Sequence, residues 1–381
     1  MKRIDPERLA ALIEAHAAAE LAENRIGGKE IAVDQAGRPV FRRAFGFADA
    51  CLPARRLYRA ASMTKPITAA AVLRLADGGK LDPDWPAARF YPELNRMRVA
   101  EVRDGKIVST RPARGVIRVS DLLSHTSGVG CSPVAEALAD DNSALPLKEA
   151  VRRILSHPLS FDPRTAQAYS GTDAFDLAAG IVAMVSEMPF EEYLKREIFD
   201  PLGMVDTTFD PDPGQWARMV PMHKRTAAGE SAVSETTPGR VFETFAPERT
   251  SAGAGLAVTA DDYLRFAEML RAGGVSADGA RILSEAAVRR MSTPNVPAAL
   301  GMSCEQWGLG VRVIAEPGYP HGLGVGCFGW SGAYGTHFWV DKENGIVAVL
   351  MKNSRYDGGA GNRSACELER DVTEALIADG S

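Results

Sequence analysis

The sequence predicts an α/β (α+β) fold: an antiparallel sheet flanked by helices, with an inserted all-helical domain. Strand-like runs occur near both ends of the chain, at 31–47 and 308–351, and helical patterns fill the middle. Because Gly and Asn-Gly turns separate these runs, antiparallel pairing is expected. The economical arrangement joins both ends in one sheet. We therefore expect an α/β sheet domain of residues 1–80 and 251–381 and a helical insertion domain of residues 81–250.

Composition and charge are those of a soluble globular protein with an ample core. The 381 residues are 45% hydrophobic and 24% charged, which allows one large or two ordinary domains. The net charge of −5 and the lack of a basic stripe argue against nucleic acid as a partner. No run approaches the ~18 apolar residues of a membrane helix. The charged, alanine-rich N-terminus lacks the apolar core of a signal peptide, so we expect a cytoplasmic protein.

Neither cysteines nor histidines predict a disulfide framework or a metal site. The cysteines are odd in number and scattered, without a Cys-x-x-Cys pair, and we expect buried or inert thiols at Cys51, Cys131, Cys304, Cys327 and Cys366. The six histidines show no ligand spacing. Dinucleotide and phosphate-loop fingerprints are absent, as is the Gly-x-Ser-x-Gly nucleophile elbow. We expect no metal and no cofactor.

The elements are expected in the following order. Residues 5–23 form an amphipathic helix, and residues 31–33 and 39–47 form a hairpin around the turn at 34–37. After the helix near Ser62, the middle of the chain contains a short polar hairpin around 104–105, a short helix N-capped by Ser120 and ended by Gly128, helices at 147–155, 172–185 and 191–199, and a loop-like segment at 205–250. The remainder contains a helix at 259–270 N-capped by Thr259, a helix at 284–291, strands at 308–314, 329–340 and 346–351, and a final helix at 365–377.

The stretch 61–67 joins an irregular segment to a long apolar run that stops at Gly78-Gly79. The run has the length of a helix and is apolar nearly all round, so it should be buried. Pro66 is tolerated only in a first turn, which places the helix start at or near Ser62. Ser62 and Lys65 then share one face, as a nucleophile and its base would. The alternative is an N-cap serine followed by a surface lysine.

His125, between Ser124 and Thr126, could suggest a catalytic triad. A histidine that is hydrogen-bonded within a turn is the simpler interpretation, and we favour it here.

Three motifs then stand in order along the chain: Ser62-x-x-Lys65, Tyr169-Ser170-Gly171 and Trp330-Ser331-Gly332. Together they resemble the serine β-lactamase and penicillin-binding-protein superfamily, over roughly residues 10–375. Ser-His-Thr-Ser-Gly at 124–128, Pro-Leu-Gly-Met at 201–204 and Gly-Ala-Gly-Leu at 253–256 strengthen this resemblance.

Within that superfamily, the chain most resembles the class C-like esterases, the family VIII carboxylesterases. Gly171 stands where the tyrosine motif has Asn, and Trp330 stands where the lysine of Lys-Thr-Gly is found. The resemblance implies a β-lactamase/transpeptidase-like fold with its active site in the cleft between the two domains.

The resemblance also implies roles for individual residues. Ser62 attacks the acyl carbon, while Lys65 and Tyr169 take and pass the proton. The backbone N–H groups of Ser62 and Ala333 form the oxyanion hole. The strand that carries Ser331 and Gly332 binds the substrate, with Trp330 as an apolar wall. Arg355 could meet a substrate carboxylate, although a solvated arginine is the commoner case.

The expected activity is hydrolysis of short-chain carboxylic esters, with a small-molecule ester as the partner. A β-lactamase or D-amino-acid peptidase would use the same chemistry, but Trp330 removes a cation for the substrate carboxylate. An amidase for linear amides and an acyltransferase also stay open. A binding or sensor protein is the alternative of a different class, and stable acylation without turnover would reveal it.

Overall fold

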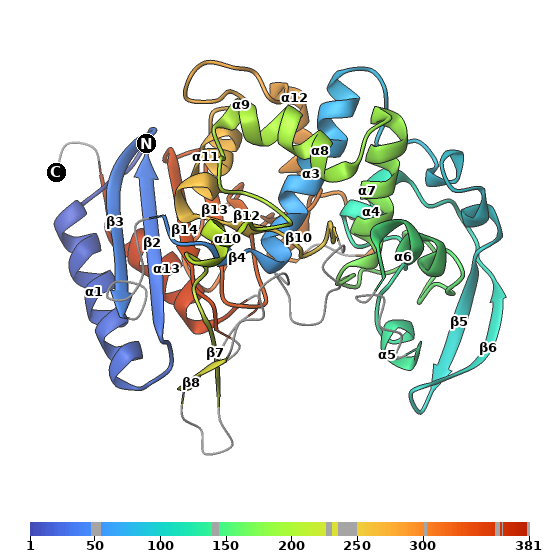
Figure 1. Cartoon of the computed structure of the whole chain (residues 1–381), viewed down its shortest axis with the longest axis horizontal. Coiled ribbons are helices and arrows are strands. Elements are labelled where there is room, and N and C mark those ends of the chain that lie inside the picture. The colour runs from blue at the N-terminus through green and yellow to red at the C-terminus, as the bar shows by residue number, and fades with distance from the viewer. Residues whose placement is uncertain are drawn as a thin grey trace.

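A seven-stranded antiparallel sheet organises the molecule (Figure 1). The computed structural model describes residues 1–46, 55–138, 145–225, 231–234, 250–300, 303–354, 359 and 361–378. The strand order is β10-β11-β12-β13-β14-β2-β3. In that order the strands are Glu305–Trp307, Arg312–Ile314, Phe328–Ser331, His337–Asp341, Ile346–Met351, Gly28–Gln35 and Arg38–Gly46.

The two ends of the chain meet inside this sheet, because β14 pairs antiparallel with β2, with Val349 opposite Ala32. The hairpin β2–β3 turns at Ala36 and Gly37, whose φ angles are both positive, at 50° and 74°. Such angles match the two-residue turns that follow the twist of an antiparallel pair. The predicted fold class is confirmed.

Helices cover both faces of the sheet. Helices α1 (Pro6–Ala22) and α13 (Arg363–Glu374) pack on one face, where they bury Trp339. Helices α3 (Thr64–Asp77) and α11 (Ala260–Arg271) lie on the other face. There Phe338 and Val340 join their core, and α12 (Glu285–Met291) packs against α3. Since successive residues of a strand point to opposite faces, β13 contributes to both cores.

The middle of the chain is mostly helical, and its described residues between Ala87 and Ser186 lie to the right of α3 in Figure 1. Its helices are α4 (Val119–Leu123), α5 (Val134–Leu138), α6 (Leu147–Ile154), α7 (Asp173–Ser186), α8 (Phe190–Leu194), α9 (Asp200–Leu202) and α10 (Pro213–Trp216), with a π turn at Lys195–Phe199 and 3₁₀ turns at Ala87–Arg89 and Pro92–Arg96. The hairpin of β5 (Arg98–Arg103) and β6 (Lys106–Pro112) turns at Asp104-Gly105, as predicted. The proposed domain boundaries at 80/81 and 250/251 stay a prediction.

Short strands complete the fold. β1 (Arg3–Ile4) pairs with β15 (Leu376–Ile377), so the described parts of the two termini lie together beside the sheet (Figure 1). The other short pairs are β4 (Tyr58–Arg59) with β9 (Ala257–Val258), and β7 (Met222–Arg225) with β8 (Ser231–Ser234); a 3₁₀ turn spans Ala298–Leu300.

Several boundaries differ from the sequence prediction. The N-cap of α4 is Arg118 rather than Ser120, because the Asp121 carboxylate accepts from the Arg118 N–H at 2.9 Å. Of the strand expected at 308–314, only 312–314 is extended, since the chain turns at Gly310, with φ of 73°, where it approaches α3 closely. The strand Glu305–Trp307 was not predicted. The predicted positions Cys51 and Arg355 lie outside the described residues.

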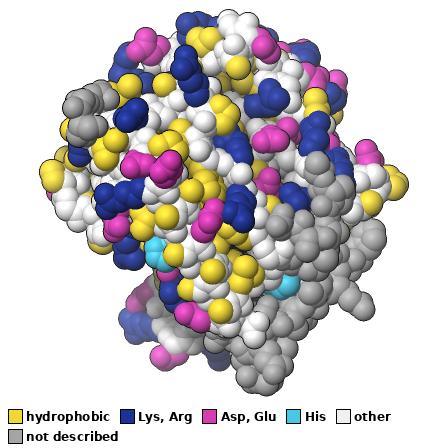
Figure 2. Space-filling model, turned by 90° about the vertical axis from the view of Figure 1, so that its left-hand side faces the viewer, with side chains coloured by type: hydrophobic (Ala, Val, Ile, Leu, Met, Phe, Trp, Pro, Cys, Tyr) yellow, Lys and Arg dark blue, Asp and Glu magenta, His cyan; other side chains and the backbone are white. Residues whose placement is uncertain are grey.

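The surface has mixed charge. On the face in Figure 2, Lys and Arg side chains alternate with Asp and Glu side chains, so no extended field of one sign is present on that face. In the described part of the chain, no helix has both the length and the apolar character needed to cross a membrane.

Candidate active site

Ser62 lies in a 3₁₀ turn, Ala61–Met63, that leads directly into α3. Ala61 has a φ of +48°, a conformation that costs an L-residue on the order of 1 kcal/mol. Neighbouring elements hold this turn in place: the Tyr263 hydroxyl of α11 donates to the Met63 carbonyl at 2.8 Å, and the Leu256 N–H donates to Thr64 Oγ1 at 3.2 Å. Ser62 is therefore presented from a fixed, strained backbone.

Lys65 is fully buried beneath Ser62. Its Nζ lies 3.2 Å from Ser62 Oγ, 2.6 Å from the Gly171 carbonyl oxygen and 2.8 Å from the Gly253 carbonyl oxygen. These three acceptors match the three hydrogens of an ammonium group. The alternative of a surface lysine is wrong. At Gly171 the site holds Lys65 through a backbone carbonyl and not through a side chain.

Tyr169 meets Ser62 from the other side, with its hydroxyl 2.7 Å from Ser62 Oγ. Its side chain is 40% exposed, unlike Lys65. The turn at 124–128 positions it, because the His125 carbonyl accepts from the Ala168 N–H at 3.1 Å and His125 Nδ1 accepts from the Ser170 N–H at 3.0 Å. The structure thus brings Tyr169 to Ser62 and Lys65, although the sequence separates it from both by more than a hundred positions.

His125 supports this arrangement and does not contact Ser62. It is fully buried, and burial, followed by the charge of Lys65, holds the pKa of its imidazole well below the ordinary value. The neutral ring can therefore accept at Nδ1 from the Ser170 N–H. The interpretation of His125 as a hydrogen-bonded turn residue is confirmed.

The turn after β12 approaches Ser62 closely through Gly332. A Cβ at Gly332 would lie 2.4 Å from the Ala60 carbonyl oxygen and 2.1 Å from Thr336 Oγ1. Only glycine fits there, because such distances are far below van der Waals contact. The next residue, Ala333, is exposed, and none of the residues that the structure describes accepts from its N–H. This N–H is available to a ligand beside the Ser62 turn.

Comparison with known proteins agrees with this geometry. The sequence profile of the family described as Beta-lactamase matches residues 10–366. The chain belongs to the β-lactamase family. Esterase EstB of Burkholderia gladioli is 32% identical over 94% of this chain and 94% of its own. An uncharacterised protein of Mycobacterium tuberculosis (MT1414) is 32% identical over 80% of this chain and 79% of its own.

The fold is also that of known members. The structure of EstCE1, described as a hydrolase with promiscuous acyltransferase activity, superposes with a TM-score of 0.79 at 23% identity. The superposition covers 97% of this chain and 99% of the EstCE1 chain. The resemblance to the β-lactamase and penicillin-binding-protein superfamily is therefore confirmed.

Trp330 stands beside Tyr169. The two rings are 5.6 Å apart, and Trp307 packs edge-on against Trp330 at 4.3 Å. Sequence reasoning missed Trp307, although an aromatic residue directly before Gly308 and a predicted strand was a usable signal. Tyr169, Trp307 and Trp330 lie together next to Ser62, and we call these three residues the aromatic wall.

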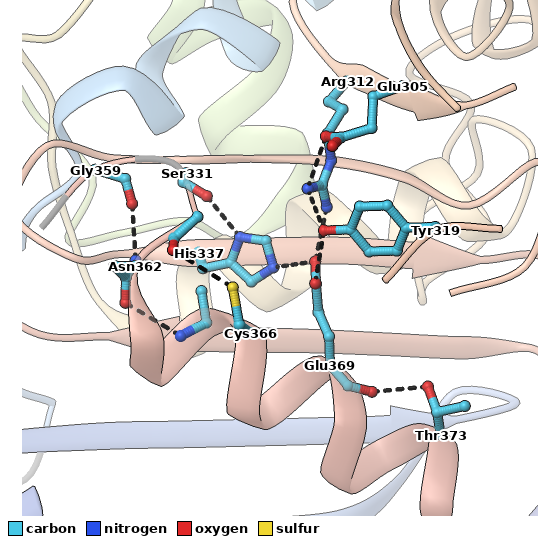
Figure 3. A network of polar contacts seen from close by, with 12 residues as sticks. Glu305, Arg312, Tyr319, Ser331, His337, Gly359, Asn362, Cys366, Glu369 and Thr373 are labelled. Atoms are coloured by element: carbon cyan, nitrogen blue, oxygen red, sulfur yellow. Dashed lines mark hydrogen bonds and ion pairs between the residues drawn. The ribbon is translucent and has the colours of Figure 1, made fainter. Parts of the chain in front are cut away.

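Ser331 is placed differently from the prediction. Its side chain is buried on the face of the sheet that α13 covers, with Oγ 2.7 Å from His337 Nδ1 (Figure 3). Trp330 packs with the core on the opposite face, as strand alternation requires. The Ser331 side chain therefore points away from the Trp330 side chain, with which the prediction had grouped it. Among the described residues, no cluster of His, Cys, Asp and Glu has the arrangement of a metal site.

Proposed function

We propose that this protein is a serine hydrolase that cleaves short-chain carboxylic esters through an acyl-enzyme on Ser62. One observation carries the proposal: Ser62 Oγ lies 2.7 Å from the Tyr169 hydroxyl and 3.2 Å from Lys65 Nζ. A serine hydroxyl needs a neighbouring base to become a nucleophile, and both neighbours are within reach of proton transfer.

The proton balance of the reaction follows from these contacts. In the reactive state the pair formed by Lys65 and Tyr169 has lost one proton, so Ser62 Oγ attacks the ester carbonyl as its own proton passes to that pair. Tyr169, as the exposed member, returns a proton to the departing alkoxide, which leaves as the alcohol. Water then attacks the acyl group, and the same pair carries its proton back to Ser62 Oγ. The N–H groups of Ser62 and Ala333 stabilise the oxyanion in both steps.

An uncharged ester suits the aromatic wall better than a β-lactam does. A β-lactam carries a carboxylate, and a charge-assisted hydrogen bond to it is worth roughly 1.5–3 kcal/mol. Trp330 has no cation to offer, and its indole has one N–H donor only. Apolar rings can instead bury the acyl or alcohol part of an ester. The similarity to Esterase EstB over most of both chains supports the same substrate class.

A comparison of substrates tests the proposal. We expect kcat/KM for a short-chain nitrophenyl ester to exceed that for benzylpenicillin by at least ~100-fold, or about 2.7 kcal/mol of transition-state binding. Ser62→Ala serves as the control for background hydrolysis. Trp330→Ala should cost ester turnover more than any lactam turnover. Equal turnover of penicillin and ester would instead favour a β-lactamase, and transfer of the acyl group from Ser62 to an added alcohol in place of water would favour an acyltransferase.

A further inference from the structure

A chain of hydrogen-bonded polar side chains begins on strand β12 and lies on the face of the sheet that α13 covers (Figure 3). Ser331 Oγ lies 2.7 Å from His337 Nδ1, and His337 Nε2 lies 3.1 Å from Glu369 Oε1. Ser331, His337 and Glu369 are 4%, 1% and 1% exposed. We call these three residues the buried chain. They link helix α13 to strands β12 and β13.

Glu369 is itself firmly held. Arg312 Nη2 donates to Glu369 Oε1 at 2.7 Å, and the Tyr319 hydroxyl donates to Oε2 at 2.8 Å. Burial alone would raise the pKa of Glu369, but the hydrogen bonds and charges of His337 and Arg312 outweigh it and lower the pKa to about 2. Glu369 is therefore a carboxylate and only accepts, so His337 Nε2 carries a proton. The other ring nitrogen, Nδ1, is bonded to the Ser331 hydroxyl.

The order Ser-His-Glu is that of a catalytic triad, but the location excludes this role. Ser331 is buried under α13, on the face of the sheet opposite to Trp330 and the aromatic wall. A substrate carbonyl cannot reach its Oγ there, because reaction with a nucleophile requires near-contact and alignment. The buried chain can therefore affect catalysis only through the backbone segment that it positions.

What it holds is the turn 332–336, which carries Ala333. Ser331 and His337 are directly opposite in the last pair of β12 and β13, so their side-chain bond closes the base of this turn. Within the turn, the Gly332 N–H donates to the Thr336 carbonyl at 2.7 Å. Thr336 Oγ1 in turn donates to the Ala60 carbonyl at 3.0 Å, two residues before Ser62. Both ends of the turn are thus fixed relative to the Ser62 turn.

We propose that Ser331, His337 and Glu369 are positioning residues that hold the Ala333 N–H at its place in the oxyanion hole. This inference rests on the proposed function, in which the Ala333 N–H stabilises the oxyanion. Loss of one oxyanion donor typically costs 10²–10³ in kcat. Because the buried chain moves such a donor without deleting it, we expect about a tenfold to hundredfold loss of kcat when the chain is broken.

Two nearly isosteric substitutions isolate the hydroxyl of Ser331. Ser331→Val and Ser331→Thr add similar bulk, but only threonine keeps a hydroxyl for His337 Nδ1. We expect Ser331→Val to lower kcat for a short nitrophenyl ester about tenfold to hundredfold, with KM within about threefold of wild type. Ser331→Thr should stay within about threefold in both. Should either variant fail to fold, Ser331→Ala removes the hydroxyl without added volume.

Asp371 provides a matched control on the same helix. Its carboxylate is buried and hydrogen-bonded to a histidine, with Oδ2 3.0 Å from His16 Nδ1. This pair joins α13 to α1 and not to β12. Asp371→Asn should lower the melting temperature while leaving kcat unchanged. An equal loss of kcat in Asp371→Asn, assayed well below its melting temperature, would overturn the proposal, because general loosening of α13 would then explain the effect.

An arylboronic acid gives a readout that does not need turnover. Its tetrahedral adduct on a serine places one oxygen where the oxyanion forms, so its affinity reports on the oxyanion hole. We expect its affinity to fall in Ser331→Val and Ser331→Ala by the same factor as kcat, and to be retained in Ser331→Thr and Asp371→Asn. Wild-type affinity in Ser331→Val would overturn the inference. Absence of ester turnover in the wild type would instead count against the proposed function, while the boronate comparison still tests the oxyanion hole.

Discussion

Lys65 shows what residue spacing can and cannot predict. A separation of three positions at a helix start was enough to place it on the same side as Ser62, and the structure puts the two groups 3.2 Å apart. Its other two contacts, to the carbonyl oxygens of Gly171 and Gly253, involve backbone 106 and 188 positions away. Any residue type offers a carbonyl, so no motif could reveal these two acceptors.

Tyr169 is expected to matter for turnover and little for folding. Its hydroxyl contacts Ser62 Oγ at 2.7 Å, while 40% of the side chain is exposed. Tyr169→Phe should lower kcat by ~10²-fold, the scale of general acid–base catalysis, with an almost unchanged melting temperature. The measurement is steady-state hydrolysis of an alkyl ester, whose poor leaving group needs a proton. Near-normal turnover of that ester would remove Tyr169 from the mechanism.

Gly332 should not tolerate a methyl group. A Cβ there would lie 2.4 Å from the Ala60 carbonyl oxygen, so the Ser62 turn and the 332–336 turn would be pushed apart. Gly332→Ala should lower both kcat and the free energy of unfolding, the latter by about 1–3 kcal/mol, as overpacking does. Gly324→Ala is the control, because nothing lies within 4 Å of a Cβ at Gly324. Equal stability of the two variants in denaturant unfolding would contradict the close approach.

At the scale of elements, the turn at 124–128 is a fixed support for the tyrosine motif. His125 has a positive φ of 60° and joins the turn to residues 168–170 through its carbonyl and its ring. The start of α7 depends on the same segment, because Ser170 Oγ accepts from the Ala174 N–H at 3.1 Å. A short turn thus orients Tyr169 through backbone contacts that require a neutral histidine.

This support should weaken in acid. The folded pKa of His125 is depressed below its unfolded value near 6.5, so its contribution to stability is complete above about pH 6.5 and falls as pH decreases through that window. The unfolded chain binds the extra proton there, and the slope is about 1.4 kcal/mol per pH unit. His125→Asn keeps an acceptor for the Ser170 N–H but does not titrate.

The measurement compares unfolding free energies of wild type and His125→Asn at pH 7.5 and 5.5. We expect the wild type to lose its advantage over the variant on acidification, by about 1 kcal/mol or more. Other groups titrate equally in both proteins and cancel in this difference. Parallel pH dependences of the two proteins would show that His125 does not govern this part of the acid sensitivity.

Element types followed from periodicity, whereas several ends and orientations did not. The helix after Ser62 ends at Gly78 as expected, because glycine stops a helix locally. The cap of α4 depended on a carboxylate contact from Asp121, which the Ser120 pattern concealed. The orientation of Ser331 was available from alternation, since it follows Trp330 on a strand. The resemblance to a family motif had instead grouped the two side chains together.

At the scale of the whole molecule, β2 near the N-terminus pairs with β14 near the C-terminus, which joins both ends of the chain in one sheet. The strand patterns at the two ends of the sequence were sufficient to predict this joining. The ordered motifs gave the family, which the match over residues 10–366 confirms. The cytoplasmic location and the domain boundaries stay predictions. The site itself needs the whole fold, because α3, the segment before α7 and the turn after β12 each supply one part.

Covalent labelling of Ser62 tests the central claim most directly. A fluorophosphonate reacts with an activated serine, and mass spectrometry of the digested protein locates the adduct. We predict one adduct, on the peptide that contains Ser62, and no labelling of Ser62→Ala under the same conditions. An adduct on Ser124 or on the buried Ser331, or labelling that persists in Ser62→Ala, would contradict the assignment of Ser62 as the nucleophile.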